Sequence, residues 1–102
     1  MDYRVIISQP ALRDLGTIAR FIAQGPHGSP AAAEKIGEEL IALSESLATL
    51  PHRGPAVRRR PGLRKLSHRY YLIFYHVTEP TRLVEIVRIW DGRQNPSRLT
   101  LH

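Results

Sequence analysis

The strongest structural pattern in the chain is SPAAAEKIGEELIALSESLATLP, residues 29–51. Serine followed by proline is typical of a helix start, because the hydroxyl can cap a free backbone N–H and proline suits the first turn. Apolar residues then recur at intervals of four and three, which places them on one helix face: Ile36, Leu40, Leu43, Leu47 and Leu50. We therefore predict an amphipathic helix that begins after Ser29, runs to Leu50 and ends at Pro51.

Another helix is predicted upstream of this one. Residues 3–7 alternate in the manner of a strand, and Ser8 can cap a helix that follows it. Apolar residues then recur at helical spacing: Leu12, Leu15, Ile18, Ala19 and Ile22. The segment Gly25-Pro26-His27-Gly28 interrupts this pattern. Because the loop is short, the two helices are expected to form an antiparallel hairpin.

The second half of the chain is rich in strand signals. Residues 51–62 hold three prolines, two glycines and four arginines, so they are expected to form an exposed, irregular basic loop. Strands are predicted at 63–66, 70–77 and 83–90, with a turn at 79–81 between the last two. The expected fold is a single α+β domain, residues 1–102, in two layers. Its order is β-α-α-β-β-β, with the helical hairpin packed on a mainly antiparallel sheet.

Composition narrows the classes of function. The chain has no cysteine, no signal-peptide pattern and no apolar run long enough for a membrane span, which favours a cytoplasmic protein. Residues 1–51 contain 4 basic and 6 acidic side chains, whereas residues 52–102 contain 11 and 3. Thirteen of the 15 basic residues are arginine, whose planar guanidinium binds phosphate and carboxylate in a bidentate manner. The partner is therefore expected to be a polyanion or an acidic protein segment.

Several segments in order form a series that resembles the ParE/RelE superfamily of bacterial toxins. They are residues 3–8, 11–15, 18–23, 47–51, 62–64, 71–77 and 87–93, the last of which reads VRIWDGR. The resemblance implies the toxin half of a type II toxin–antitoxin pair, neutralised by a cognate ParD/RelB-like antitoxin in a hetero-oligomer. It also implies one of two activities. RelE-like members cut messenger RNA on the ribosome, whereas ParE-like members inhibit DNA gyrase.

The residues that RelE-like cleavage needs are poorly matched here. Cleavage through the 2′-hydroxyl needs cations beside the phosphate and a proton carrier. The resemblance gives these roles to Arg64, Lys65 and Arg88, with His76 or His102 as the proton carrier. However, Leu72 stands where the family has a central-strand arginine, and no tyrosine follows Tyr75. The ParE-like interpretation, an inhibitor of DNA gyrase without catalytic residues, is therefore favoured over the RelE-like endoribonuclease.

The residues expected to bind the target or the antitoxin lie in the basic half of the chain. They are Arg58, Arg59, Arg60, Arg64, Lys65, Arg69, Arg88, Trp90 and Arg93. Strict alternation places Arg88 on one strand face with Val84, Ile86 and Trp90, where it either forms an internal salt bridge or faces an open groove. The pattern does not decide which face meets the helices. The five histidines lack metal-ligand spacing, so no metal and no cofactor are expected.

The division of charge also suggests how the antitoxin binds. An acidic and apolar antitoxin segment, disordered when free, is expected to lay a helix on the helical hairpin and add a strand to the sheet. Its carboxylates are expected to meet the arginines between Arg58 and Arg69. Association should then be fast and sensitive to salt.

Overall fold

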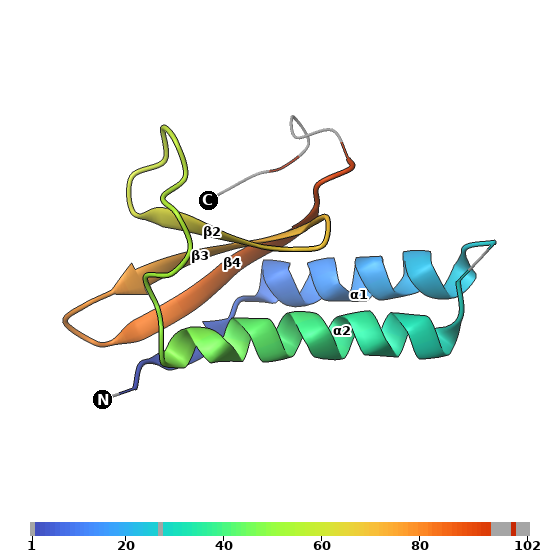
Figure 1. Cartoon of the computed structure of the whole chain (residues 1–102), viewed down its shortest axis with the longest axis horizontal. Helices are drawn as coiled ribbons and strands as arrows, with labels where there is room; N and C mark the ends of the chain where they lie inside the picture. Colours follow the sequence, from blue (N-terminus) through green and yellow to red (C-terminus); the bar gives the residue numbers. More distant parts are fainter. Residues whose placement is uncertain (1, 27, 95–98, 100–102) are drawn as a thin grey trace.

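The computed structural model describes residues 2–26, 28–94 and 99, and it has the element order that the sequence predicts. Two long helices lie side by side and cover one face of a sheet (Figure 1). The elements are β1 (Arg4–Ile7), α1 (Gln9–Gln24), α2 (Pro30–Glu45), the short 3₁₀ helix η1 (Ser46–Ala48), β2 (Leu63–His68), β3 (Tyr71–Thr78) and β4 (Leu83–Asp91). The predicted α+β class and β-α-α-β-β-β order are confirmed.

The sheet has the strand order β1-β4-β3-β2. β2, β3 and β4 pair in antiparallel fashion, whereas β1 runs parallel to β4. The sheet is therefore mixed, with its antiparallel part in the majority. A parallel pair needs a long connection, and in this fold that connection contains the helical hairpin.

Both helices begin where the sequence predicts. Ser8 Oγ accepts a hydrogen bond from Ala11 N, and Ser29 Oγ accepts one from Ala32 N. These bonds satisfy backbone N–H groups that the first turn leaves without helical partners.

The predicted end of the second helix is wrong. α2 ends at Glu45 and tightens into η1 instead of continuing to Leu50. Ser46 Oγ donates to Leu43 O, so a side chain takes over a carbonyl of the last helical turn. Leu47 stays fully buried, but Leu50 is 57% exposed and lies outside the core.

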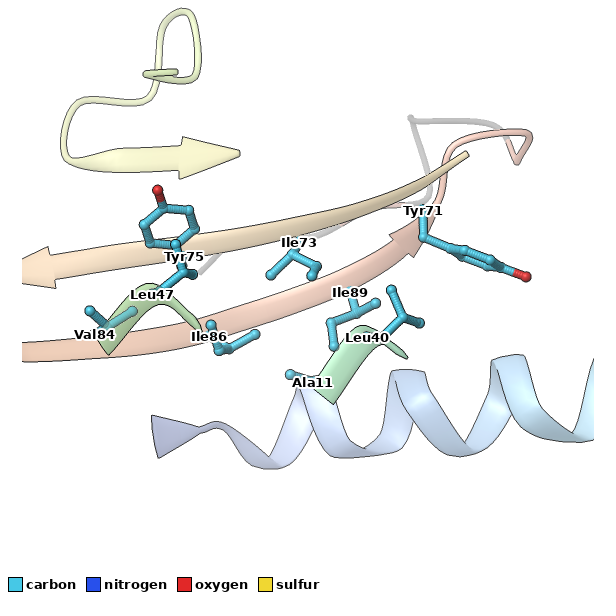
Figure 2. Packing of buried hydrophobic residues seen from close by; sticks show 9 residues of the cluster. All are labelled: Ala11, Leu40, Leu47, Tyr71, Ile73, Tyr75, Val84, Ile86 and Ile89. Atoms are coloured by element: carbon cyan, nitrogen blue, oxygen red, sulfur yellow. The ribbon is translucent and has the colours of Figure 1, made fainter. Parts of the chain in front are cut away.

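The main core fills the space between the sheet and the helices (Figure 2). α1 contributes Ala11, and the α2–η1 segment contributes Leu40 and Leu47. The sheet contributes the helix-facing side chains of β3 and β4, which are Tyr71, Ile73, Tyr75, Val84, Ile86 and Ile89. The structure thus identifies the side of β4 that meets the helices.

A register shift in β4 changes the alternation that the sequence suggests. The helix-facing residues of β4 step from Ile86 to Ile89, three positions instead of two, because the pairing with β3 shifts between Phe74 and Tyr75. A bulge of this kind adds a residue to one strand and turns the following side chains. The prediction that Arg88 and Trp90 share a face with Val84 and Ile86 is therefore wrong, because Arg88 and Trp90 pair with Phe74 and Leu72 on the outer face.

The outer face of the sheet, turned away from the helices, carries a smaller apolar cluster. Leu63, Phe74 and Val87 are its buried members, and Val57, Leu72, Trp90 and Leu99 pack against it. Within the described residues, no helix is long and apolar enough to cross a membrane.

Candidate functional site

A carboxylate on α1 holds the strand arginine that the family resemblance singles out. Arg88 donates from Nε to Asp14 Oδ2 and from Nη2 to Asp14 Oδ1, each at 2.8 Å. Two parallel bonds are the strong, bidentate form of an arginine–carboxylate pair. Asp14 Oδ2 also accepts the backbone N–H of Ile89 at 2.8 Å. The side chains of Arg88 and Asp14 are only 20% and 13% exposed. Hydrogen bonding to Asp14 raises the pKa of Arg88 and favours its charged form.

This pair lies at the edge of β4, beyond the end of β1. β1 covers β4 only as far as Ile86. Farther along, Ser8 Oγ donates to Val87 O at 3.0 Å, and Asp14 takes the N–H of Ile89. Side chains from the start of α1 thus replace a strand partner and protect the edge from pairing with another chain. A cavity of about 430 Å³ lies beside them, lined by Ser8, Pro10, Arg13, Asp14, Glu85, Val87 and Arg88.

Of the other two cations of the RelE-like hypothesis, Lys65 shares the outer face of the sheet with Arg88, because both pair with Phe74, whereas Arg64 does not. Arg64 is paired with core residue Tyr75, whereas Lys65 is paired with Phe74 of the outer cluster. Because directly paired residues share a face, Arg64 and Lys65 lie on opposite faces of the sheet. Arg64 Nη1 donates to the carbonyls of His52 and Gly54 at 3.1 and 2.7 Å, which anchors the loop after η1.

Of the two histidines proposed as proton carriers, only His76 lies within the residues that the structure describes. His76 lies on β3 opposite Leu63 and Glu85. Its Nδ1 donates to Gly62 O at 2.8 Å, so Nε2 of the neutral ring is the nitrogen that can accept a proton. His102 lies outside the described residues. Within the described ranges, no three histidine, cysteine, aspartate or glutamate side chains gather closely enough to hold a metal ion.

The chain's relationship to known proteins agrees with this architecture. A model of the ParE toxin, the toxin of the type II toxin–antitoxin system parDE, matches residues 5–96. The chain belongs to the ParE toxin family. It is thus a type II toxin of the ParE/RelE superfamily.

Solved toxin structures share the fold of this ParE-family chain. The RelBE2 toxin–antitoxin complex of Mycobacterium tuberculosis matches with a TM-score of 0.67 and 22% identity, over 87% of this chain and 96% of that chain. The chromosomal ParDE system of Pseudomonas aeruginosa matches with a TM-score of 0.72 and 19% identity, over 85% and 92%. The isolated RelE toxin of Escherichia coli matches with a TM-score of 0.56 and 17% identity, over 94% and 90%. A comparison with curated protein sequences finds no match.

The two aromatic and basic residues near the end of β4 have structural partners in this ParE-family chain. Trp90 packs against the outer cluster. Arg93 binds Asp91 through two side-chain bonds of 2.9 and 2.7 Å, and its guanidinium carbon lies 3.7 Å from the centre of the Tyr70 ring. Hydrogen bonding to Arg93 holds the pKa of Asp91 below its ordinary value. The contact fastens the end of β4 to the turn between β2 and β3.

A second charged contact joins this turn to α2. His68 Nε2 donates to Glu39 Oε1 at 2.7 Å, and Arg69 Nε lies 3.5 Å from the same oxygen. These contacts lower the pKa of Glu39, chiefly through the bond from His68.

Sequence reasoning missed Asp14 as the partner of Arg88. It lies three positions after the buried Ala11 and four before Ile18, on the side of α1 that meets the sheet, and 74 positions from Arg88. The available signals were a carboxylate at helical spacing with these apolar residues and its place within residues 11–15, one of the segments that carry the family resemblance.

Proposed function

We propose that this ParE-family toxin stops growth by inhibiting DNA gyrase in the cytoplasm and does not cut messenger RNA. The observation that carries the proposal is the Asp14–Arg88 pair. A catalytic arginine must present its guanidinium to the phosphate, whereas two of the donors of Arg88 are directed at a carboxylate.

A phosphate that approached Arg88 would meet two obstacles. A phosphate that took the Nε and Nη2 donors would have to displace Asp14, and the N–H of Ile89 would lose its partner as well. Leaving such groups unpaired costs about 1 to 3 kcal/mol each, and more for a charge. The Asp14 carboxylate would also repel the incoming anion at short range. These costs favour a structural role for Arg88.

The RelE-like endoribonuclease remains the second candidate because of Lys65 and His76. Both lie on the outer face of the sheet, where they pair with Phe74 and with Leu63, and His76 has a nitrogen suited to proton transfer. Arg88 pairs with Phe74 on the same face, but its bidentate bond to Asp14 occupies two of its donors, so the set for cleavage through the 2′-hydroxyl is incomplete.

Primer extension on messenger RNA after induction of the toxin separates the two candidates. The gyrase proposal expects growth arrest with intact transcripts. Cleavages at the ribosomal A site that disappear in Lys65→Ala or His76→Ala would support the endoribonuclease instead. Ser67→Ala is the control variant, because Ser67 lies on β2 with Lys65 and its replacement removes neither Lys65 nor His76.

We also propose that a cognate antitoxin lays an apolar helix along α2. A groove of about 420 Å³ is present there, lined by Glu39, Ala42, Leu43, Ser46, Arg53 and His68. Ile41 and Leu50 lie close in sequence to the groove residues Ala42 and Ser46, and their side chains are 38% and 57% exposed. They therefore offer apolar surface to a partner helix. Arg53 supplies positive charge for an acidic segment. Antitoxin binding at this groove would leave the gyrase proposal unchanged.

A further inference from the structure

The tip of the basic loop is a hydrogen-bonded structure that we call the arginine turn, residues Val57–Leu63. Arg60 N donates to Val57 O at 3.2 Å, and Leu63 N donates to Arg60 O at 3.1 Å. Val57 N donates to Leu63 O at 2.8 Å and closes the loop. The predicted irregular loop is therefore two successive turns with a closing bond, and its charged side chains project from an ordered backbone.

The two turns differ in how well their residues suit the backbone. The second contains Pro61 followed by Gly62, whose φ is +84°, and glycine adopts this left-handed conformation without strain. The first has Arg58 and then Arg59, whose φ is +66°. A side chain at such a position costs about 1 to 2 kcal/mol. The chain thus places an arginine where glycine would be more stable, as it also does in the turns at Arg69 and Arg82.

The arginine turn lies within the most basic segment of the chain. Residues 53–65 contain six basic side chains and no acidic one. Among the described residues, no carboxylate forms a salt bridge with Arg58 or Arg59. Arg53 and Arg64 donate to a serine hydroxyl and to backbone carbonyls, so these neutral partners leave their charge uncompensated.

The chemistry of this segment favours a nucleic acid over a protein. Protein interfaces depend on a few buried apolar or aromatic anchors. Among the residues that the structure describes, the exposed large apolar side chains lie outside the arginine turn, and they are Ile6, Leu12, Phe21, Ile41, Leu50 and Tyr70. A loop of arginines without such anchors, and without a helix to enter a groove, suits contact with backbone phosphates.

We propose that the arginine turn binds duplex DNA through its phosphates and without sequence preference. Arg58, Arg59 and Arg60 are the residues assigned to this contact. The inference deepens the gyrase proposal, because a toxin that holds DNA can engage gyrase on its DNA substrate. DNA binding is nevertheless a property of this chain alone, so its failure and the failure of gyrase inhibition can be told apart.

The test measures fluorescence anisotropy of a labelled mixed-sequence duplex of about 20 base pairs with the purified toxin. Contact with three phosphates predicts that affinity falls about 40-fold between roughly 50 and 200 mM NaCl. Neutralising Arg58, Arg59 and Arg60 to glutamine should weaken binding at least about tenfold at the lower salt and flatten the salt dependence. A second duplex of different sequence should bind equally well.

Three further variants test whether a loss of DNA binding comes from the arginine turn itself, and not from the lower net charge or from unfolding. Arg4→Gln/Arg13→Gln/Arg20→Gln removes the same charge from β1 and α1, and it should bind DNA more tightly than the arginine-turn variant. Arg59→Gly should raise the melting temperature, because it relieves the left-handed strain, and yet weaken DNA binding. Arg59→Lys should retain most of the affinity.

The proposal is overturned by any of three results. The first is an equal loss of DNA affinity in the two triple variants. The second is unchanged DNA affinity in Arg59→Gly. The third is that poly-glutamate displaces the labelled duplex as effectively as unlabelled duplex does at equal charge. The last result would show a surface for acidic protein segments instead.

Discussion

Replacing Asp14 with asparagine should lower the free energy of unfolding by about 2 to 3 kcal/mol. Asp14 accepts three hydrogen bonds of 2.8 Å, two from Arg88 and one from Ile89. Asparagine retains only one acceptor oxygen and turns an amide N–H₂ toward a donor, so at least one bond is lost and a charge is left unpaired. Breaking a fully buried pair costs about 3 to 5 kcal/mol, and partial exposure of both side chains reduces that figure.

Urea and thermal unfolding measure this effect. In a domain of this size each 1 kcal/mol shifts the melting temperature by about 4 to 8 °C, so Asp14→Asn should melt roughly 10 to 20 °C lower. A double-mutant cycle with Arg88→Met should give a coupling energy above about 1.5 kcal/mol. An unfolding free energy within about 0.5 kcal/mol of the parent, or a coupling near zero, would refute the reasoning.

Three further predictions concern the loop, the core and the antitoxin. Gly54→Ala should destabilise the fold by at least about 2 kcal/mol in urea unfolding, because its Cβ would lie 2.7 Å from both Lys65 O and the Tyr75 hydroxyl. Burial raises the pKa of Tyr71 from 10.0 to about 12, so the folded state holds the phenol proton more tightly than the unfolded state does. The contribution of Tyr71 to the free energy of unfolding is therefore complete below pH 10 and is lost as the pH rises to about 12. Tyr71→Phe should remove that loss in unfolding measured across the same pH range. In stopped-flow experiments antitoxin association should slow with added salt and with Arg53→Gln, and a salt-independent rate would remove the electrostatic part of the proposal.

Much of the fold could be predicted because its signals are local. Ser8 and Ser29 cap the helices through bonds to residues only three positions away. The bulge in β4 was not predictable, because it depends on pairing with β3. The early end of α2 was also missed, since the apolar spacing continues through Leu47 while the backbone tightens at Ser46.

The candidate site was less predictable than the fold because its contacts join distant segments. The sequence left Arg88 with two alternatives, an internal salt bridge or an open groove, and a residue on α1 decides between them. The grouping of Arg64 with Lys65 was wrong for a local reason, because adjacent residues of a strand point to opposite faces of the sheet. For Arg59, composition predicted the loop and its charge, but only the backbone reveals the left-handed conformation.

Inhibition of purified DNA gyrase tests the central claim most directly. Relaxed plasmid, gyrase and ATP are incubated with increasing toxin, and the supercoiled product is resolved on an agarose gel. We expect supercoiling to fall at micromolar toxin, and Lys65→Ala and His76→Ala to inhibit as well as the parent protein. Supercoiling that is unaffected at micromolar concentration, by a toxin that still arrests growth when expressed, would contradict it.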